Sequence, residues 1–535
     1  MDADLLIVGG GPVGMLGAIL ASRQGLSAIV VERRTGPQTA PAAHVVNART
    51  YEIFRQAGLD MDRIHAAGKD PAQAGHVNFV TRLGGELIGR LPFERQGDDC
   101  LAFTPTPLRN LSQHRLEPIL ADELRASPGV ELRYGVRWEG SARSADAVSS
   151  DVVDEVSGEQ TTLRTRYLIG CDGAGSRVRR SLGIEMVGPP LLQYFLMIHF
   201  RADLRDLTAD RPAVLHFTLD PDEESVDDYP DERCLEVITK AAGVDLHAEV
   251  IGKGTWRMSA QTADGMGGDR VFLAGDAAHR FPPTGGPGLN SGVQDIHGLL
   301  WRLGAIVRGT AQEALLDSYA DERLPVAHNN ATQSVTNAIR MVALPAALGT
   351  DVDPTTERLH ASLRDPSKAH EIAAAVEEQR EHFDLFGLQL GYVYENGAII
   401  SEPGEYVSPP PSEFVPTARP GARLPHAWVD RMGGRSTLDL VPVDRPALVT
   451  FGAHDEWVAA AGPGPVIVRI GVDTPPLDAW RQLCELGPTG ALLVRPDHHV
   501  AWRASSIDGS AALAEALAVV SGRHETHPPA TATAP

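Results

Sequence analysis

Residues 4–32, DLLIVGGGPVGMLGAILASRQGLSAIVVE, carry the strongest fold signal in this chain. The apolar run at 4–9 is too short for a helix and ends at glycines, which is typical of a buried parallel strand. Positions 13–23 are helical in pattern and apolar on most faces, and 27–32 is a second short run rich in β-branched residues. The order strand, helix, strand predicts a βαβ unit and therefore an α/β fold.

The turn between the first strand and the helix, GGGPVG at 9–14, has the spacing of a dinucleotide-binding fingerprint. Gly9 permits the tight turn, Gly11 lets the backbone approach a pyrophosphate at the helix N-terminus, and Gly14 lets the helix pack on the sheet. Glu32 ends the second strand, where a carboxylate accepts ribose hydroxyls and repels a 2′-phosphate, so FAD or NAD is expected rather than NADP. The candidate contacts are Gly9, Gly11, Pro12, Val13, Gly14, Glu32 and Arg33.

Composition excludes several classes of protein. With 535 residues, 43% of them apolar and 22% charged, the chain is globular and long enough for about three folding units. Its net charge of −22 disfavours a nucleic-acid partner. It has neither a basic signal region nor a run of about 18 apolar residues, so no membrane segment and no export by that route are expected. The cysteines form no CxxC pair, which predicts no zinc ribbon and fits a reducing cytoplasm; they are Cys100, Cys171, Cys234 and Cys484.

The pattern downstream gives a domain plan. Helices are expected at 47–57, 114–126 and 291–308, and strands at 164–170 and 270–275. Three β-rich runs separated by acidic turns predict an inserted sheet, at 193–204, 213–219 and 233–238. Prolines crowd the segment 401–425, which marks a linker. The plan is a dinucleotide-binding domain at 1–184 and 266–400, a sheet domain at 185–265, a linker at 401–433, a C-terminal αβ domain at 434–523 and a disordered tail at 524–535.

A second motif follows the strand at 270–275, where Gly275-Asp276 leads into the loop PPTGGPGLN at 282–290 and directly into a helix. Together, GGGPVG at 9–14, CDGAGSRVR at 171–179 and RVFLAGDAAHRFPPTGGPGLNSGVQD at 270–295 resemble the three signatures of the class A flavoprotein aromatic hydroxylases, in that family's order and at its intervals. The resemblance implies a Rossmann-like FAD-binding domain with an inserted β-sheet substrate domain. It also implies noncovalent FAD, with NADH or NADPH as a transient reductant.

The resemblance assigns roles to individual residues. It implies that Asp172-Gly173 serves FAD and nicotinamide binding, that Asp276 contacts the flavin ribityl chain, and that Gln113 lies on the flavin side. Taken singly, these residues are also typical of a turn, a helix N-cap and a solvated helix start. The further candidate FAD contacts are Gln113, Asp172, Gly275, Asp276, Pro283, Gly286, Gly288, Leu289 and Asn290.

The implied reaction is NAD(P)H + O2 + ArH giving NAD(P)+ + ArOH + H2O, with a flavin C4a-hydroperoxide attacking an electron-rich ring carbon. The resemblance places the carbonyl of Pro283 near a phenol that must lose its proton, and the backbone amides of Gly285 and Gly286 near the flavin. Candidate substrate residues on the inserted sheet are Tyr194, His199 and His216, each of which also fits a packing or surface position.

One position departs from the family pattern. In relatives, an arginine near the moving flavin usually stands where this chain has Ala42, in TAPAAHVVNART. Flavin movement or nicotinamide docking is therefore expected to use another group, with His44 and Arg49 as candidates. Either residue also fits an ordinary surface or core position.

The resemblance continues into the C-terminal part. PTARPGARLPHAW at 416–428, followed by GALLVRPDHHVAWRA at 490–504, resembles the phenol hydroxylase branch, which includes chlorophenol and polyketide hydroxylases and carries a thioredoxin-like C-terminal domain. A thioredoxin fold does redox work through paired thiols, but Cys484 is the single cysteine of this domain. The domain is therefore expected to be structural, with a homodimer contact as one use.

The sequence leaves several alternatives open. A flavin-dependent epoxidase acting on an alkene would share all three signatures. A non-enzymatic escort-type protein of the same fold would keep the glycine loop but would not need Gly275-Asp276. The sequence also leaves open whether the aromatic substrate belongs to natural-product biosynthesis or is a simple phenol that is degraded, and whether NADH or NADPH is the reductant.

Overall fold

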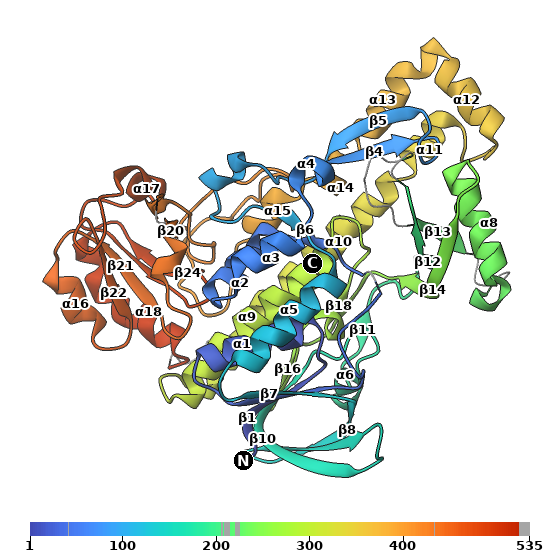
Figure 1. The fold of residues 1–535 in the computed structure, drawn as a ribbon. Coiled ribbons are helices and arrows are strands. Elements are labelled where there is room, and N and C mark those ends of the chain that lie inside the picture. Colours follow the sequence, from blue (N-terminus) through green and yellow to red (C-terminus); the bar gives the residue numbers. More distant parts are fainter. Residues whose placement is uncertain (41, 205–206, 208–214, 220–224, 433, 524–535) are drawn as a thin grey trace, which may run out of the picture.

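The computed structural model describes residues 1–40, 42–204, 207, 215–219, 225–432 and 434–523, and for 215–219 it describes the backbone alone. The molecule has a central sheet covered by helices, an arm formed by an inserted sheet and several helices, and a C-terminal domain on the opposite side (Figure 1). Within the described part of the chain, no helix is both long and apolar enough to span a membrane.

The central sheet contains the predicted βαβ unit. Its strands are β1 (Ala3–Val8), β2 (Ala28–Glu32), β7 (Val130–Tyr134), β8 (Val136–Arg143), β9 (Val148–Asp154), β10 (Gln160–Gly170), β16 (Gly267–Gly268) and β17 (Val271–Leu273). Strands β17, β10, β1, β2 and β7 pair in parallel, in that order, while β8 and β9 extend antiparallel from β10. The α/β prediction is therefore confirmed.

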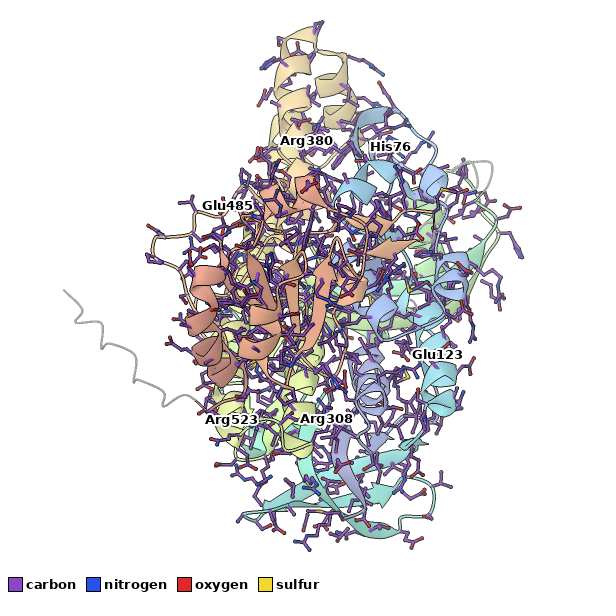
Figure 2. The ribbon with its side chains drawn as sticks, turned by 90° about the vertical axis from the view of Figure 1, so that its left-hand side faces the viewer. His76, Glu123, Arg308, Arg380, Glu485 and Arg523 are labelled. Carbon is purple, nitrogen blue, oxygen red and sulfur yellow. The ribbon has the colours of Figure 1, made fainter. Side chains whose placement is uncertain are left out.

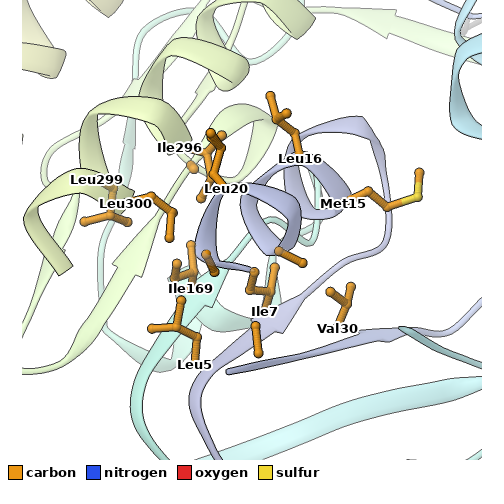
Figure 3. Close-up of a cluster of buried hydrophobic side chains, with 14 of the residues drawn as sticks. Leu5, Ile7, Met15, Leu16, Leu20, Val30, Ile169, Ile296, Leu299 and Leu300 are labelled. Carbon is orange, nitrogen blue, oxygen red and sulfur yellow. The ribbon is translucent and has the colours of Figure 1, made fainter. Parts of the chain in front are cut away.

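Three helices cover one face of this sheet: α1 (Pro12–Arg23), α5 (Gln113–Ala126) and α9 (Pro287–Val307). Figure 3 shows side chains of β1, α1 and α9 meeting between sheet and helices, among them Ile7, Leu20 and Ile296, all fully buried. A Cβ atom at Gly17 would lie 2.7 Å from the Ile296 side chain, so α1 and α9 cross where one of them lacks a side chain.

Most predicted elements in this domain are present. The expected helix at 47–57 is α2 (Ala48–Gln56), and the expected strand at 164–170 is the second half of β10. Helix α9 begins at Pro287 rather than near Ser291, because Gly286 adopts a left-handed conformation (φ 63°) as its N-cap and proline presets the next φ.

The inserted domain contains a three-stranded antiparallel sheet. Its strands are β12 (Gln193–Ala202), β13 (Leu215–Leu219) and β14 (Ala248–Met258), in the order β13-β12-β14. The prediction of a strand at 233–238 is wrong, because this run lies in helix α8 (Asp231–Ala242). Its buried residues, Cys234, Ile238 and Ala242, are spaced by four, which is a helical period that cannot be recognised within the short run 233–238. Gly243, in the left-handed region, ends the helix.

A second part of the arm joins distant segments of the chain. The hairpin β4 (His76–Val80) and β5 (Leu87–Pro92) packs on helices α11 (Ala343–Leu348), α12 (Thr356–Arg364) and α13 (Ala369–Glu377) (Figure 1). They enclose a small apolar cluster of their own around Leu91, Leu344, Ile372 and Val376. A Cβ atom at Gly89 would lie 2.7 Å from Val376, so the hairpin and α13 are in close contact.

The C-terminal domain has the order strand, helix, strand, helix, strand, strand, helix. Its elements are β21 (Ala447–Phe451), α16 (Asp455–Ala461), β22 (Val466–Ile470), α17 (Asp478–Leu483), β23 (Ala491–Val494), β24 (Val500–Ala504) and α18 (Leu513–Val520). The sheet order β22-β21-β23-β24, parallel only between β21 and β22, is the expected thioredoxin-like arrangement. Cys484 is fully buried, and this burial raises the pKa of its thiol to about 12, which disfavours the reactive thiolate.

A buried ionic junction fixes this domain to the rest of the molecule. Glu322, on helix α10 (Asp317–Arg340), accepts from Arg302 of α9 and from Arg495 of the β23–β24 turn, each at 2.6 Å. Arg495 also pairs with Asp497, and the Asp497 carboxylate accepts the indole N–H of Trp301 at 3.1 Å. In Figure 2 the C-terminal domain faces the viewer and covers the middle of the molecule.

We expect Glu322→Gln to lower the free energy of unfolding by about 3 to 5 kcal/mol, because it leaves two buried guanidinium groups without their full counter-charge. Urea unfolding followed by circular dichroism measures this loss. Glu377→Gln is the matched control, since Glu377 forms an exposed pair with Arg380 three residues along the chain and such pairs contribute about 1 kcal/mol or less. Equal losses in the two variants would contradict a special role for the junction.

Candidate active site

The glycine turn at 9–14 is closed on one side and open on the other. Gly9 has φ 110°, and a Cβ atom there would overlap the carbonyl oxygen of Cys171, while one at Gly14 would overlap the carbonyl oxygen of Gly9. At Gly11, by contrast, no described atom lies within 4 Å of the position that a Cβ atom would take, and no described side chain caps the helix that follows. The first N–H groups of α1 therefore face open space, which suits a pyrophosphate.

Glu32 ties the end of β2 to this turn. Its buried carboxylate accepts the backbone N–H of Gly10 at 2.8 Å and that of Arg34 at 2.9 Å. The Arg34 guanidinium also pairs with it at 3.1 Å, whereas the predicted contact Arg33 is exposed. Both Arg34 bonds go to Oε1, whereas Oε2 accepts only the Gly10 N–H and keeps a second acceptor position, so a ribose hydroxyl can still be bound there.

Gly275 and Asp276 lie beside the same turn. Val13 packs against both Gly275 and Gly292, because a Cβ atom at Gly292 would lie 2.7 Å from the Val13 side chain and 2.9 Å from the Gly275 Cα. Solvent reaches the Asp276 side chain, yet the surrounding protein desolvates it enough to raise its pKa, against the opposing effects of His279 and Arg280. Asp276 is therefore accessible to a ligand and lies close to the start of α9, where the Cβ position of Gly288 is 3.9 Å from its Oδ1.

The loop beyond Asp276 is held from behind by Asp295. This fully buried carboxylate accepts from the Gly275 N–H at 3.1 Å, from Arg323 at 2.8 Å, and from His279 at 2.6 Å. Burial would raise the pKa of Asp295, but His279 and Arg323 outweigh it and lower the pKa to about 2. Asp295 therefore stays ionised and fixes where β17 ends and α9 begins.

The glycine loop 282–286 packs against the segment around His44. A Cβ atom at Gly286 would lie 2.8 Å from Val45, and Asn290 donates to the Val45 carbonyl at 2.9 Å. The N–H of Gly286 already donates to the Pro283 carbonyl at 2.9 Å, closing a turn. The Gly286 amide is thus engaged within the protein, whereas Pro283 is exposed and its carbonyl keeps one acceptor position.

Several predicted cofactor residues have clear partners inside the protein. The side-chain carbonyl oxygen of Asn290 accepts from the backbone N–H of Asn47 at 3.0 Å and from the Thr50 hydroxyl at 2.8 Å, so this side chain joins α9 to α2. Asp172 accepts from Ser176, Arg177 and Val178 and caps helix α6 (Arg177–Ser181). At the start of α5, the Gln113 side chain donates to the Glu117 carboxylate at 2.7 Å. The Cβ position of Gly288 lies 3.9 Å from Asp276, and the Leu289 side chain packs on the hydrophobic core.

The predicted substrate residues are not brought together. Tyr194 packs into the cluster under α8, whereas His199 is close enough to His114 of α5 to help lower the His114 pKa, after burial and Arg115. Successive residues of a strand face opposite sides of its sheet, so these two candidates, five positions apart on β12, point away from each other. The side chain of His216, on β13, lies outside the described residues.

Two residues are candidates to replace the family arginine that is missing at Ala42, and one of them, Arg49, is bound to other parts of the protein. Arg49 is fully buried and binds Glu52 at 3.0 Å, the Asp497 carbonyl at 2.7 Å and the His498 ring at 3.2 Å. It therefore fixes α2 to the C-terminal domain. His44 is exposed beside the glycine loop, with its ring 6.4 Å from that of Phe93.

Sequence reasoning missed two polar residues at this site. Asn337 of α10 is fully buried, and its Nδ2, without a hydrogen-bond partner in the described structure, lies 3.6 Å from the Cβ position of Gly285. Glu94, also buried, accepts the N–H of Leu385, whose side chain closes over Gly285. Neither residue belongs to a motif, and only the packing of α10 and of the segment at 383–385 brings them to the loop.

These features fit a flavin dinucleotide. Three features are relevant: the open helix start at Gly11, the solvent-accessible Asp276 carboxylate, and the Asn337 Nδ2, which has no described partner and lies behind Gly285. A glycine turn and helix N-terminus suit its pyrophosphate, and an enclosed carboxylate suits a sugar or ribityl hydroxyl.

Comparisons with known proteins agree with this geometry. A family model described as "FAD binding domain" matches residues 2–230 and 213–334, and one described as "Aromatic-ring hydroxylase, C-terminal" matches 417–523. The chain is 33% identical to the tetracenomycin A2 monooxygenase-dioxygenase of Streptomyces glaucescens, over 99% of both chains. It is 29% identical to the 2,4-dichlorophenol 6-monooxygenase of Cupriavidus pinatubonensis, over 98% of this chain and 97% of that one. A crystal structure of the flavin-dependent monooxygenase PieE with FAD and substrate superposes with a TM-score of 0.91, at 32% identity over 98% of this chain and all of PieE.

Replacing Gly9 by alanine should remove FAD from the purified protein, because the left-handed backbone and the Cys171 carbonyl leave no room for a methyl group. We expect less than about a tenth of the wild-type flavin content, a loss of about 1.4 kcal/mol or more in binding. Gly25→Ala is the matched control, since Gly25 also has a positive φ, 75°, but no described atom within 4 Å of its Cβ position. The flavin-to-protein absorbance ratio decides, and equal flavin in both variants would count against the assigned turn.

Proposed function

The chain belongs to the FAD-dependent aromatic-ring hydroxylases, and from this we propose that it hydroxylates a fused-ring phenol of the tetracenomycin class, with NAD(P)H as reductant and O2 as oxidant. The observation that carries the choice of substrate is the match to the tetracenomycin A2 enzyme, which extends over 99% of both chains at 33% identity. The chlorophenol enzyme matches over nearly the same length at 29%. A simple phenol is therefore the competing substrate.

FAD would be held at its two ends by different elements. The start of α1 would bind the pyrophosphate, Glu32 the adenosine ribose, and Asp276 the ribityl chain. When bound, the flavin supplies the transfer of electrons from the nicotinamide and the activation of O2. Asp276 suits its role because its carboxylate is accessible to a ligand and is desolvated enough by the surrounding protein to raise its pKa.

The loop 282–286 would serve the aromatic substrate. The exposed Pro283 carbonyl can accept a hydrogen bond from a phenolic O–H, which weakens that bond and raises electron density in the ring. The Val45 and Leu385 side chains pack against Gly286 and Gly285, which gives the loop apolar neighbours. Of the two backbone amides, that of Gly285 is the better candidate, because the Gly286 amide already binds Pro283.

Asn337 adds a donor that motif analysis did not provide. Its fully buried side chain accepts from Gln333 through Oδ1, but its Nδ2, which lies behind Gly285, has no acceptor among the described residues. A buried amide without a partner is unfavourable unless a ligand or water completes it. We assign it to orienting the loop or the substrate oxygen.

We expect Asp276→Ala to weaken FAD binding by about tenfold or more, equal to about 1.4 kcal/mol, because the variant loses the only assigned contact to the ribityl chain. Fluorescence titration of the deflavinated protein with FAD gives the dissociation constant. Cys484→Ala is the control: it also changes a buried side chain, but in the C-terminal domain, and should leave FAD affinity within about twofold. Similar losses in both folded variants would refute the assignment.

The reaction itself is tested with labelled dioxygen and mass spectrometry. With a fused-ring phenol, one labelled oxygen atom should enter the ring ortho or para to the existing hydroxyl, because a phenolate is electron-rich at those carbons. The specificity constant kcat/KM should exceed that for 2,4-dichlorophenol by about tenfold or more, or about 1.4 kcal/mol. Label from water alone would overturn the monooxygenase reaction, a labelled epoxide would favour the epoxidase, and the reverse preference would favour a simple phenol.

A further inference from the structure

Arg323, on helix α10, connects three parts of the chain that meet beside the start of α9. Its side chain is fully buried, and its Nε donates to the Asp295 carboxylate at 2.8 Å. Its Nη1 donates to the Tyr394 hydroxyl at 3.2 Å, and its Nη2 donates to the Ser291 carbonyl at 3.4 Å. Three separate acceptors therefore fix the plane of this guanidinium group, although no step of the proposed reaction involves it.

On one side, Arg323 fixes how the Asp295 carboxylate is turned. The guanidinium occupies Oδ1, which leaves Oδ2 to accept from the Gly275 N–H at 3.1 Å and from His279 Nε2 at 2.6 Å. Gly275 and His279 lie on either side of Asp276 in the sequence. The orientation of one buried carboxylate thus fixes the backbone just before Asp276 and the side chain just after it.

On the other side, the segment that carries Tyr394 is attached to the linker. This segment follows helix α15 (Phe386–Leu390), and the Tyr394 N–H donates to the Gly421 carbonyl at 3.1 Å. Gly421 has φ 89°, and a Cβ atom there would overlap the Tyr394 carbonyl oxygen, so the two backbones are in close contact. The Gly421 N–H in turn donates to the Val500 carbonyl of β24 at 2.8 Å. Gly421 therefore joins Tyr394 to the C-terminal domain.

His499 adds a side-chain connection between the same parts. Its Nδ1 donates to the Gly421 carbonyl at 2.8 Å, so its Nε2 accepts from the Tyr392 hydroxyl at 3.3 Å. Burial lowers the pKa of His499 to about 3, which keeps the ring neutral and preserves these two roles. The His499 ring lies 4.4 Å from that of Tyr394, and the Arg323 guanidinium lies 5.7 Å from the centre of the Tyr392 ring. The C-terminal domain therefore holds both tyrosines against Arg323.

We propose that Arg323 is a positioning residue for FAD binding, and that through it the C-terminal domain takes part in forming the flavin site. His499 and Gly421 hold the two tyrosines, and the tyrosines hold Arg323. Arg323 in turn orients the Asp295 carboxylate, which places Asp276. The proposal rests on the assignment of Asp276 to FAD under the proposed function. It gives a use to a domain whose single cysteine has no second thiol beside it in that domain for redox chemistry.

Removing the Tyr394 hydroxyl tests this connection with the loss of one atom. Phenylalanine keeps the ring against His499, but it leaves a buried N–H of Arg323 without its acceptor, so that the guanidinium can turn away from Asp295. We expect Tyr394→Phe to raise the dissociation constant of FAD by about tenfold. Fluorescence titration of the deflavinated protein with FAD measures it.

The matched control is Tyr167→Phe. Tyr167, on β10, is also buried, and its hydroxyl donates to the Glu313 carboxylate at 3.2 Å, outside the contacts of Arg323. This variant loses the same chemical group and should change the FAD dissociation constant by less than about twofold. Equal losses of affinity in Tyr394→Phe and Tyr167→Phe would overturn the proposal.

Hydrogen exchange in the deflavinated protein separates positioning from a general loss of stability. Amides in 274–281 should exchange about tenfold faster in Tyr394→Phe than in the wild type, because the Gly275 N–H depends on Asp295 as its acceptor. Amides of β2, in the same sheet, should keep their wild-type rates. Faster exchange in both segments, or unchanged exchange in 274–281, would overturn the positioning role.

A double variant tests whether the effect reaches FAD through Asp276. In the Asp276→Ala background, Tyr394→Phe should change the FAD dissociation constant by less than about twofold, because the group that is positioned is already missing. Losses that multiply would overturn the proposed path. An unchanged constant in Asp276→Ala alone would instead overturn the assignment of Asp276 in the proposed function.

Tyr392→Phe tests the part played by the C-terminal domain. It removes the hydroxyl that donates to His499 and leaves the ring beneath Arg323 in place. We expect the FAD dissociation constant to rise by about threefold, with faster exchange again confined to 274–281. An unchanged constant and unchanged exchange in this variant would overturn the contribution of the domain.

Discussion

The close approach of backbone to backbone at the glycines of β1, α1, β17 and α9 is the constraint on which the rest of this structure depends. Gly9 touches the Cys171 carbonyl, Gly14 touches Gly9, and Gly292 lies against Gly275. Without side chains at these points, the two helices begin beside each other at the carboxyl edge of the parallel sheet, where ligands of such sheets bind. Asp295 then fixes the position of these elements, because its ionised carboxylate is hydrogen-bonded to the Gly275 N–H at the end of β17, to His279 and to Arg323 of α10.

Segments outside the recognised motifs complete the site around the glycine loop. Segments as far apart in sequence as 44–46, 93–95, 282–286 and 383–389 meet at the loop that would hold the reacting ring. The chemistry would therefore depend on these segments keeping their relative positions, which the apolar cluster of the arm and the buried ionic junction help to secure.

Features that depend on residues close together in the sequence could be predicted from it, whereas features that depend on contacts between distant segments could not. The turn at 9–14 and the loop after Asp276 were recognisable because their backbone geometry is encoded locally, by glycines and a proline at fixed spacing. The prediction of a strand at 233–238 is wrong because the buried positions of this helix extend beyond the six residues of the run, and six residues do not separate a strand from a helix. The sequence does not predict the places of Glu94 and Asn337 or the contacts of Arg49. Each of these residues meets partners between about 50 and 450 residues away along the chain, and a single sequence carries no record of such contacts.

The ionic junction with the C-terminal domain has a consequence for how such chains can evolve. Glu322 and Arg302 on one side, and Arg495 and Asp497 on the other, are complementary only as a set, as are Glu52 and Arg423. A domain exchanged with another protein by recombination would bring unmatched charges into a dry interface. We therefore expect this domain to be inherited with its scaffold rather than exchanged as an independent module.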